Sequence, residues 1–312
     1  MHFIYLYSKL VSDKIKRDRI LFMVADRLSN MLGQVVRELT EQESCKEVFY
    51  QHCDGVPLPS LTDLDEIIGL CRAILFPGYF GYSHVTSQTI GFHTGVNIER
   101  LYNKLTEQIL AALCFDKQHK ATHEFAAEIC VQFIECLPQI RQQLATDVIA
   151  AYEGDPAATS YGEVISCYPV IRALSNYRIA HQLHLLGVPL IPRVITEMAH
   201  SETGIDIHPA ATIGRYFTID HGTGVVIGAT SIIGDHVKLY QGVTLGAKSF
   251  PLDAKGNPIK GIDRHPILED NVIVYSNSTI LGRITIGRGA IIGGNVWVTE
   301  DVAPGTKLLQ KR

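Results

Sequence analysis

A histidine and two carboxylates are spaced so that they could carry out acid–base chemistry. Asp220 and His221 are adjacent, and His221 follows Ile207 by fourteen residues, which brings it near the segment that carries Asp206. Histidine is the usual general base near neutral pH, and a carboxylate on its second ring nitrogen fixes the tautomer and stabilises the imidazolium. His221, held by Asp206, could therefore remove a proton from an attacking hydroxyl group. In the structural alternative, Asp206 caps a turn and His221 forms a hydrogen bond in a corner.

The elements that must position these residues follow from a six-residue period. Aliphatic residues return at this spacing at Ile207, Ile213, Ile219, Ile227, Ile233, Leu239, Leu245, Leu268, Val274, Ile280, Ile286, Ile292 and Val298. Six residues are too few for a helical hairpin, and this period is typical of parallel β-helices, in which short strands stack coil upon coil. Glycine follows several of these positions, as a tight corner requires. We therefore predict a parallel β-helix of hexapeptide repeats.

Two breaks interrupt this period. The first is an eight-residue step from Ile219 to Ile227, which contains Asp220 and His221. The second is an inserted loop near residues 247–263. Insertions in repeat proteins lie on one face, often the binding face, and long loops in a regular stack are usually functional or mobile. We expect the functional site at these breaks.

The first half of the chain has a helical period instead. Apolar residues recur at spacings of three and four within residues 21–39, 98–113 and 125–136. Charges interleave with the apolar positions along 13–42, and we interpret them as a solvated face. Four prolines are predicted to separate packed helices, namely Pro57, Pro59, Pro77 and Pro138.

The helical pattern extends to Tyr152, breaks at Gly154-Asp155-Pro156-Ala157, and resumes from Pro169 to about Leu186. We predict an all-α helical domain over residues 1–200, which contributes Asp155 to the site, and a β-helix domain over residues 201–312.

Composition limits the classes of function. The 312 residues suggest about two domains, and the net charge of -4 offers no basic surface for nucleic acid. No basic segment precedes an apolar core at the N-terminus, and no apolar run is long enough to span a membrane. The seven cysteines precede the repeats without zinc-site spacing, so we expect reduced thiols, no metal and a cytoplasmic location.

Several strings resemble the serine O-acetyltransferase family. They are Ile205–Gly214, Ile219–Gly228, Tyr240–Gly246, Arg264-His265-Pro266, and Gly154-Asp155-Pro156-Ala157 upstream of Tyr177-Arg178-Ile179-Ala180-His181. Their order and spacing match over roughly residues 140–305, whereas hexapeptide repeats alone would indicate only the acyltransferase superfamily. The resemblance implies a left-handed β-helix. It also implies direct transfer of acetyl from acetyl-CoA to the hydroxyl of L-serine, without a covalent enzyme intermediate, in L-cysteine biosynthesis.

The resemblance also implies roles for particular residues. It assigns His221 and Asp206 as the catalytic pair, Asp155 and Asp220 to the ammonium or hydroxyl end of serine, Arg264 to its carboxylate, and His265 to the substrate site. Taken alone, Asp155 before Pro156 could be a helix cap, and Arg264 could be a surface charge. His208 is interpreted as a structural turn residue.

Acetyl-CoA is the implied co-substrate. The resemblance places it in a groove between coils of neighbouring subunits, with contacts at Gly246, Ala247, Ser276 and Gly294. Backbone amides near Gly246 and Ala247 could stabilise an oxyanion. The chain departs from the family where Ala247 replaces a common glycine and where Ala229 replaces a common glutamate, which leaves the details of substrate or inhibitor binding open.

The β-helix exposes flat sheet faces, and the superfamily buries such faces by forming homotrimers, which a helical domain can pair into a dimer of trimers. The C-terminus, Leu308-Leu309-Gln310-Lys311-Arg312, lacks the isoleucine-ended tail that docks into cysteine synthase, so that partner is not expected by that route. Two other functions remain open. One is acetyl transfer to homoserine or an amino sugar, and the other is a non-catalytic trimeric interaction platform, which would need neither Asp206 nor His221.

Overall fold

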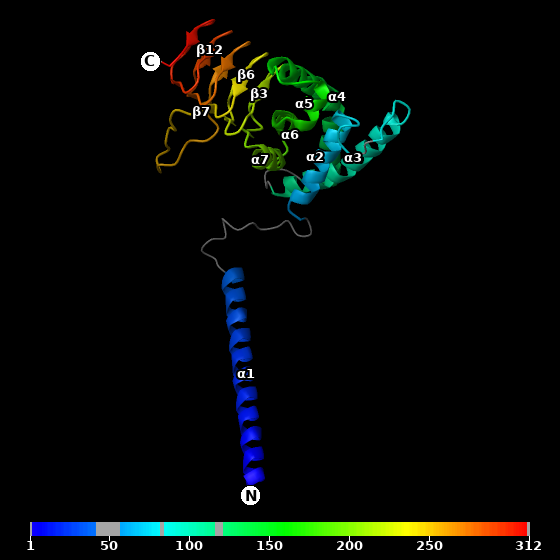
Figure 1. The fold of residues 1–312 in the computed structure, drawn as a ribbon, viewed down its shortest axis with the longest axis vertical. Helices are drawn as coiled ribbons and strands as arrows, with labels where there is room; N and C mark the ends of the chain where they lie inside the picture. Colours follow the sequence, from blue (N-terminus) through cyan, green and yellow to red (C-terminus); the bar gives the residue numbers. More distant parts are fainter. Residues whose placement is uncertain (1, 42–56, 82–83, 116–120, 311–312) are drawn as a thin grey trace. The chain divides into compact units, whose positions relative to one another are not determined.

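The computed structural model describes residues 2–41, 57–81, 84–115 and 121–310 (Figure 1). Its internal contacts divide the chain into two compact units, residues 1–51 and residues 52–312. Cys45 and Cys53, which we predict to be reduced, lie outside the described residues. The other five cysteines form no disulfide.

The first unit contains helix α1 (His2–Glu41). The prediction of a helix over residues 21–39 is confirmed. Large apolar side chains along it are exposed, among them Leu21, Phe22, Val24, Leu28, Met31, Leu32 and Val35. In the parts of the chain that the structure describes, no helix combines the length and the apolar character needed to cross a bilayer.

The second unit begins with helices packed on one another. They are α2 (Leu61–Leu75), α3 (Ile90–Phe115), α4 (His123–Gly154), α5 (Tyr161–Cys167), α6 (Pro169–Leu185) and α7 (Ile191–Thr203). The three helical stretches predicted within this unit lie in α3, α4 and α6. Ser60 and Thr122 cap α2 and α4, since each side chain accepts a hydrogen bond from the backbone N–H three residues later.

The prediction that Pro138 separates two helices is wrong, because Pro138 lies inside α4. A proline in a helix interior removes one backbone hydrogen bond and costs about 3 kcal/mol. Apolar side chains are buried on both sides of it, at Phe133, Leu137, Ile140 and Leu144. The packing of this continuous apolar face outweighs the local cost, so the helix continues.

The β-helix follows α7 and consists of short parallel strands (Figure 1). They are β1 (Asp206–Ile207), β2 (Thr212–Ile213), β3 (Thr218–Asp220), β4 (Val226–Ile227), β5 (Ile232–Ile233), β6 (Lys238–Tyr240), β7 (Thr244–Gly246), β8 (Ile267–Leu268), β9 (Ile273–Val274), β10 (Thr279–Leu281), β11 (Thr285–Ile286), β12 (Ile291–Ile292), β13 (Trp297–Val298) and β14 (Lys307–Leu308). They form three sheets, ordered β1-β4-β7-β10-β13, β11-β8-β5-β2 and β14-β12-β9-β6-β3.

The aliphatic residues of the six-residue period point into the coils. Ile207, Ile227, Leu245 and Ile280, for example, are at most 2 % exposed and lie in register on consecutive strands of one sheet. The predicted fold, a helical region followed by a left-handed parallel β-helix of hexapeptide repeats, is confirmed. The change from helix to strand falls between Thr203 and Asp206.

Residues 177–181 of helix α6 form hydrogen bonds with the first coil of the β-helix. The Tyr177 hydroxyl donates to the carbonyl of Ala211 at 2.5 Å, and His181 Nδ1 donates to the carbonyl of Pro209 at 2.7 Å. Arg178 Nε lies 2.6 Å from Asp147 Oδ2 of α4, and both side chains are buried. These contacts hold the C-terminal end of α4 beside the β-helix.

Candidate active site

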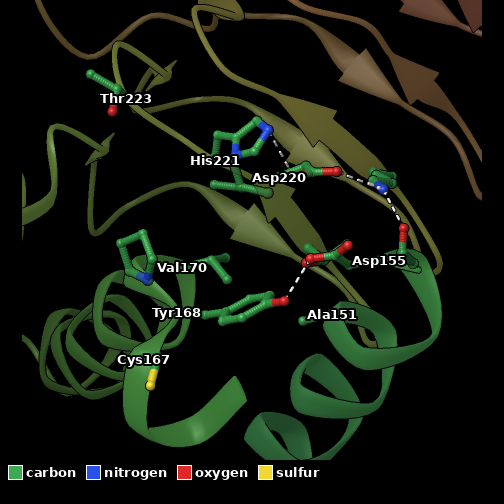
Figure 2. Close-up of a pocket in the computed structure, with 13 residues that line it drawn as sticks. Ala151, Asp155, Cys167, Tyr168, Val170, Asp220, His221 and Thr223 are labelled. Atoms are coloured by element: carbon green, nitrogen blue, oxygen red, sulfur yellow. Dashed lines mark hydrogen bonds and ion pairs between the residues drawn. The ribbon is translucent and has the colours of Figure 1, made fainter. Parts of the chain in front are cut away.

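A cavity of about 530 Å³ lies where the helices meet the first coils of the β-helix (Figure 2). Its walls are Ala151, Gly154, Asp155, Cys167, Tyr168, Pro169, Val170, Thr218, Ile219, Asp220, His221, Thr223 and Lys238. Three of the predicted site residues, Asp155, Asp220 and His221, therefore face one pocket. They come from the end of α4, the end of β3 and the corner that follows β3.

His221 lies in the first break of the period. The regular corner residues on this edge are Gly224, Gly242, Asn277 and Asn295, all with positive φ. His221 has a φ of 57° and comes before Gly224, so it belongs to the extra residues of the long step. A left-handed non-glycine residue is uncommon and concentrates at turns and functional sites. The extra residues hold the His221 side chain outward, where it is 77 % exposed.

Asp220 lies between His221 and a lysine. Its Oδ1 atom is 3.8 Å from His221 Nε2, and its Oδ2 atom is 3.0 Å from Lys238 Nζ (Figure 2). Burial lowers the pKa of Lys238, but contacts with Tyr240 and Asp220 outweigh it and raise the pKa above its usual value. Lys238 is thus a protonated counter-ion for Asp220 at neutral pH.

Asp155 ends helix α4 and has both carboxylate oxygens engaged. Its Oδ2 accepts a hydrogen bond from the Tyr168 hydroxyl at 2.6 Å, and its Oδ1 accepts one from the Ala157 N–H at 2.8 Å. The Tyr168 bond is the largest cause that lowers the pKa of Asp155, followed by the Ala157 bond. Burial opposes these bonds, and the charge of Lys238 lowers the pKa further. Asp155 is therefore both a helix cap and an ionised group that faces the pocket.

Asp206 lies at the start of β1 and does not line the cavity. Its Oδ1 is 3.5 Å from Arg193 Nη1, and among the described contacts no ion pair or hydrogen bond joins it to His221. Glu197, His200 and Asp206 are close enough to hold a metal ion, but Arg193 already pairs with Glu197 and Asp206 and supplies a positive charge there.

Arg264 and His265 lie away from this cavity, at the end of the inserted loop. Thr230 connects them, because its hydroxyl accepts hydrogen bonds from both backbone N–H groups and its own N–H donates to His265 Nδ1 at 3.1 Å. Burial is the main cause that lowers the pKa of His265 to about 4, and the charge of Arg264 adds to it. Neutral His265 thus keeps a proton on Nε2. Gly228 packs so closely on this ring that any side chain would collide with it.

The predicted acetyl-CoA contacts also fall at two places. Gly246 ends β7 and Ala247 opens the inserted loop, whereas Ser276 and Gly294 lie in corners before β10 and β13. Ser276 and Gly294 are stacked, because a side chain on Gly294 would begin 3.3 Å from the Ser276 carbonyl.

All the predicted β-helix site residues therefore lie along two edges of the sheet β1-β4-β7-β10-β13. In a parallel sheet, strand starts share one edge and strand ends share the other. The edge where strands begin carries Asp206, Asp220, His221, Ser276 and Gly294, and the edge where they end carries Gly246, Ala247, Arg264 and His265.

Sequence reasoning missed Tyr168 and Lys238. Lys238 could have been found, because one coil brings it into register with Thr218, on the strand that carries Asp220. Tyr168 joins α5 to α6 and carries no periodic signal.

Stacked hexapeptide coils with an exposed histidine and two acids define a hexapeptide-repeat transferase. The family model described as bacterial transferase hexapeptide (six repeats) matches residues 265–300. The plasmid serine acetyltransferase of Synechococcus elongatus is 45 % identical over 293 residues, which cover 91 % of this chain and 90 % of that protein. The chain belongs to the serine acetyltransferase family.

Solved structures of the same family share this fold. Serine acetyltransferase 1 of Entamoeba histolytica in complex with L-cysteine has a TM-score of 0.69 and 35 % identity, covering 88 % of this chain and 94 % of that one. Soybean serine acetyltransferase complexed with serine has a TM-score of 0.52 and 27 % identity, covering 80 % of this chain and 97 % of that one.

Proposed function

We propose that this protein transfers an acetyl group from acetyl-CoA to the hydroxyl of L-serine, giving O-acetyl-L-serine and CoA (EC 2.3.1.30) for L-cysteine biosynthesis. The observation that carries the proposal is one pocket in which Asp155, Asp220 and His221 meet, in a chain 45 % identical to a serine acetyltransferase over 91 % of its length. Relatives solved with serine or cysteine bound support an amino acid as the ligand.

The proposed base is His221. Its Nε2 takes the proton of the serine hydroxyl as the hydroxyl oxygen attacks the thioester carbonyl carbon. The carbon–sulfur bond then breaks, and the imidazolium returns the proton to the CoA sulfur. Asp206 is the proposed carboxylate for the second ring nitrogen, which requires the exposed His221 ring to turn away from Asp220. Its 77 % exposure leaves it room to do so.

The acceptor meets charges of both signs. In the proposal, ionised Asp155 binds the serine ammonium, and Asp220 lies beside the hydroxyl and the base. Arg264 binds the carboxylate, with a donor from neutral His265 beside it. No metal takes part in this mechanism.

The two edges of the sheet explain why we propose a homotrimer. Asp155, Asp220 and His221 lie at one edge, while Arg264 lies at the other, with Gly246 and Ala247. A neighbouring chain in a closed ring would bring its second edge to the first edge of this one. Acetyl-CoA would then lie between chains, with amides at Gly246 and Ala247 stabilising the oxyanion and with Ser276 and Gly294 along the groove.

We further propose that the protein works in the cytoplasm, and the free thiols of Cys71, Cys130, Cys136 and Cys167 support a reducing compartment. A dimer of trimers and docking to cysteine synthase have no support in the contacts of a single chain, and neither belongs to the proposal.

The test measures release of the CoA thiol from acetyl-CoA with L-serine, L-homoserine or glucosamine as acceptor. We expect release that depends on serine and is much slower with the other two. Faster release with homoserine or glucosamine would overturn the acceptor, and release with none of the three would favour a non-catalytic platform.

A further inference from the structure

Lys238 joins the two structural parts that form the pocket. Its Nζ donates to the carbonyl of Gly154, the last residue of α4, at 2.7 Å and lies 3.0 Å from Asp220 Oδ2. It also lies 4.6 Å from the centre of the Tyr240 ring. The ammonium group therefore bridges the helix that ends at Asp155 and the strand that ends at Asp220.

These contacts leave Lys238 little capacity to bind a substrate. An ammonium has three N–H donors, and here two of them face protein oxygens while an aromatic ring packs close by. The side chain is only 17 % exposed. With two donors engaged and little of the side chain exposed, a role in holding the pocket fits Lys238 better than a role in binding a substrate carboxylate.

Lys238 connects the end of α4 to strand β6, two elements that are far apart in the sequence. Gly154 and Lys238 are 84 residues apart. The last carbonyls of a helix lack partners within the helix and carry its partial negative charge, which a lysine stabilises. The same lysine neutralises Asp220, which would otherwise repel Asp155 across the pocket. One cation thus contacts both of the elements that carry the two acids.

We propose that Lys238 is a positioning residue for the acceptor, which fixes Asp220 and the Asp155 end of α4 at the spacing that places the acceptor hydroxyl on His221. This inference rests on the proposed function, because it assigns acceptor binding to those two acids. The residues proposed to contact acetyl-CoA, namely Gly246, Ala247, Ser276 and Gly294, do not line this pocket, so we expect donor binding to be independent of the bridge.

Charged and titratable groups face Lys238 and the pocket from each element packed around them. They are Asp155, Cys167 and Tyr168 from the helices, Asp220 and His221 at the end of β3, and Tyr240 on β6. The hydrogen bonds from Tyr168 and Ala157 are the largest causes that lower the pKa of Asp155, and the charge of Lys238 lowers it further. Loss of Lys238 therefore raises the pKa of Asp155, and ionised Asp155 is lost at a higher pH as the solution is acidified.

The experiment compares Lys238→Met, Lys238→Arg and Lys307→Met in the full chain, by steady-state kinetics with both substrates. Lys307 is the matched control, since it is an exposed lysine on β14 of the same sheet. For Lys238→Met we expect the KM for serine to rise about tenfold or more, because misplacement by about 1 Å is costly, while the KM for acetyl-CoA stays unchanged. On acidification, the KM for serine should begin to rise at a higher pH in Lys238→Met than in Lys307→Met, because less of Asp155 is then ionised. Lys238→Arg, which keeps the positive charge, should restore most of the loss.

Two results would overturn the inference. One is a Lys238→Met variant with the serine KM and pH profile of Lys307→Met, and the other is an equal loss for both substrates that Lys238→Arg does not rescue. If Lys238→Met lowers Tm or fails to assemble, Lys238→Gln, which keeps a donor but no charge, takes its place with the same criteria. A wild-type protein without serine-dependent CoA release would instead remove the proposed function itself.

Discussion

At the scale of residues, each acid of the pocket has its own partner. Asp155 accepts from the Tyr168 hydroxyl, and Asp220 pairs with Lys238. Two carboxylates in one cavity would otherwise raise each other's pKa, and these partners oppose that effect. The hydrogen bond with Asp155 is also the main cause that raises the pKa of Tyr168 to about 12, so Tyr168 remains a donor at physiological pH. The pocket therefore contains an ionised Asp155, the group that we propose binds the acceptor ammonium.

The first prediction concerns Tyr168→Phe, which removes the hydroxyl and keeps the ring. We expect the KM for serine to rise about tenfold, since Asp155 loses the hydrogen bond that holds its carboxylate in place. The pKa of Asp155 is lowered chiefly by this bond, so its loss raises that pKa. Serine affinity, which needs ionised Asp155, should then be lost at higher pH as the solution is acidified. The measurement is the KM for serine from about pH 3 to about pH 8, because the pKa of wild-type Asp155 lies below the usual carboxyl value of about 4.

Tyr161→Phe is the control, because Tyr161 packs on the Tyr152 ring nearby but does not line the pocket. Equal KM profiles for Tyr168→Phe and Tyr161→Phe would contradict the role of the Tyr168 hydroxyl.

At the scale of elements, the six-residue period predicts the β-helix because every sixth side chain must fill the inside of a coil. The first break in that period contains His221, and the structure shows that this residue lines a cavity. The period cannot predict contacts with the helices, which are remote in sequence, and Lys238 shows this with its partner Gly154 84 residues away. Pro138 shows that a local signal can also mislead. A proline predicts the end of a helix, but the buried apolar face of α4 keeps the helix continuous through it.

Arg264 and His265 are assigned to the same site as His221 by family resemblance, yet a single chain does not place them in that cavity. A sequence of one chain contains no information on which groups a neighbouring copy supplies. Roles inherited from a resemblance can therefore be right about chemistry and still leave open which chain contributes each residue.

The second prediction concerns the corner that presents His221. Gly222 has a φ of 91°, and a side chain there would begin 2.5 Å from Ile205 Cδ1. Gly222→Ala should therefore lower the free energy of unfolding by roughly 2–5 kcal/mol, through backbone strain and overpacking together. Chemical denaturation measures this loss, and CoA release should fall because the corner moves His221.

Gly256→Ala separates the two causes. Gly256 has a similar φ of 83° in the inserted loop, but nothing lies within 4 Å of an added side chain. It should lose only about 1–2 kcal/mol. An equal loss of unfolding free energy in Gly222→Ala and Gly256→Ala would show that contact with Ile205 does not define the corner.

At the scale of the whole molecule, the outer face of one sheet separates the two groups of site residues. Val226, Thr244, Thr279 and Trp297 lie in register across that face, and Trp297 at its end is 68 % exposed. An exposed, flat sheet face with a large aromatic residue is a suitable surface for another chain. A trimer that buries this face would unite His221 of one chain with Arg264 of the next.

The third prediction follows from such shared sites. His221→Ala and Arg264→Ala should each be nearly inactive, and assemblies formed from equal amounts of both should regain about a quarter of the wild-type rate. A site is intact only where an unaltered His221 edge meets an unaltered Arg264 edge, which happens for about one site in four in random closed rings. The rate is measured after denaturing and refolding the mixture. A mixture no more active than its components would show that the two residues do not act across chains.

The central claim is that His221 is the base for acetyl transfer, and the most direct test is the rate of serine-dependent CoA release by His221→Ala. The control is His236→Ala, because His236 is also left-handed, with a φ of 58°, but lies at another corner and stacks on Tyr216. We predict that His221→Ala loses about 10²- to 10⁴-fold in kcat, the usual contribution of a general base, while His236→Ala and the assembly state are unchanged. A His221→Ala protein that keeps most of the wild-type kcat would contradict the account.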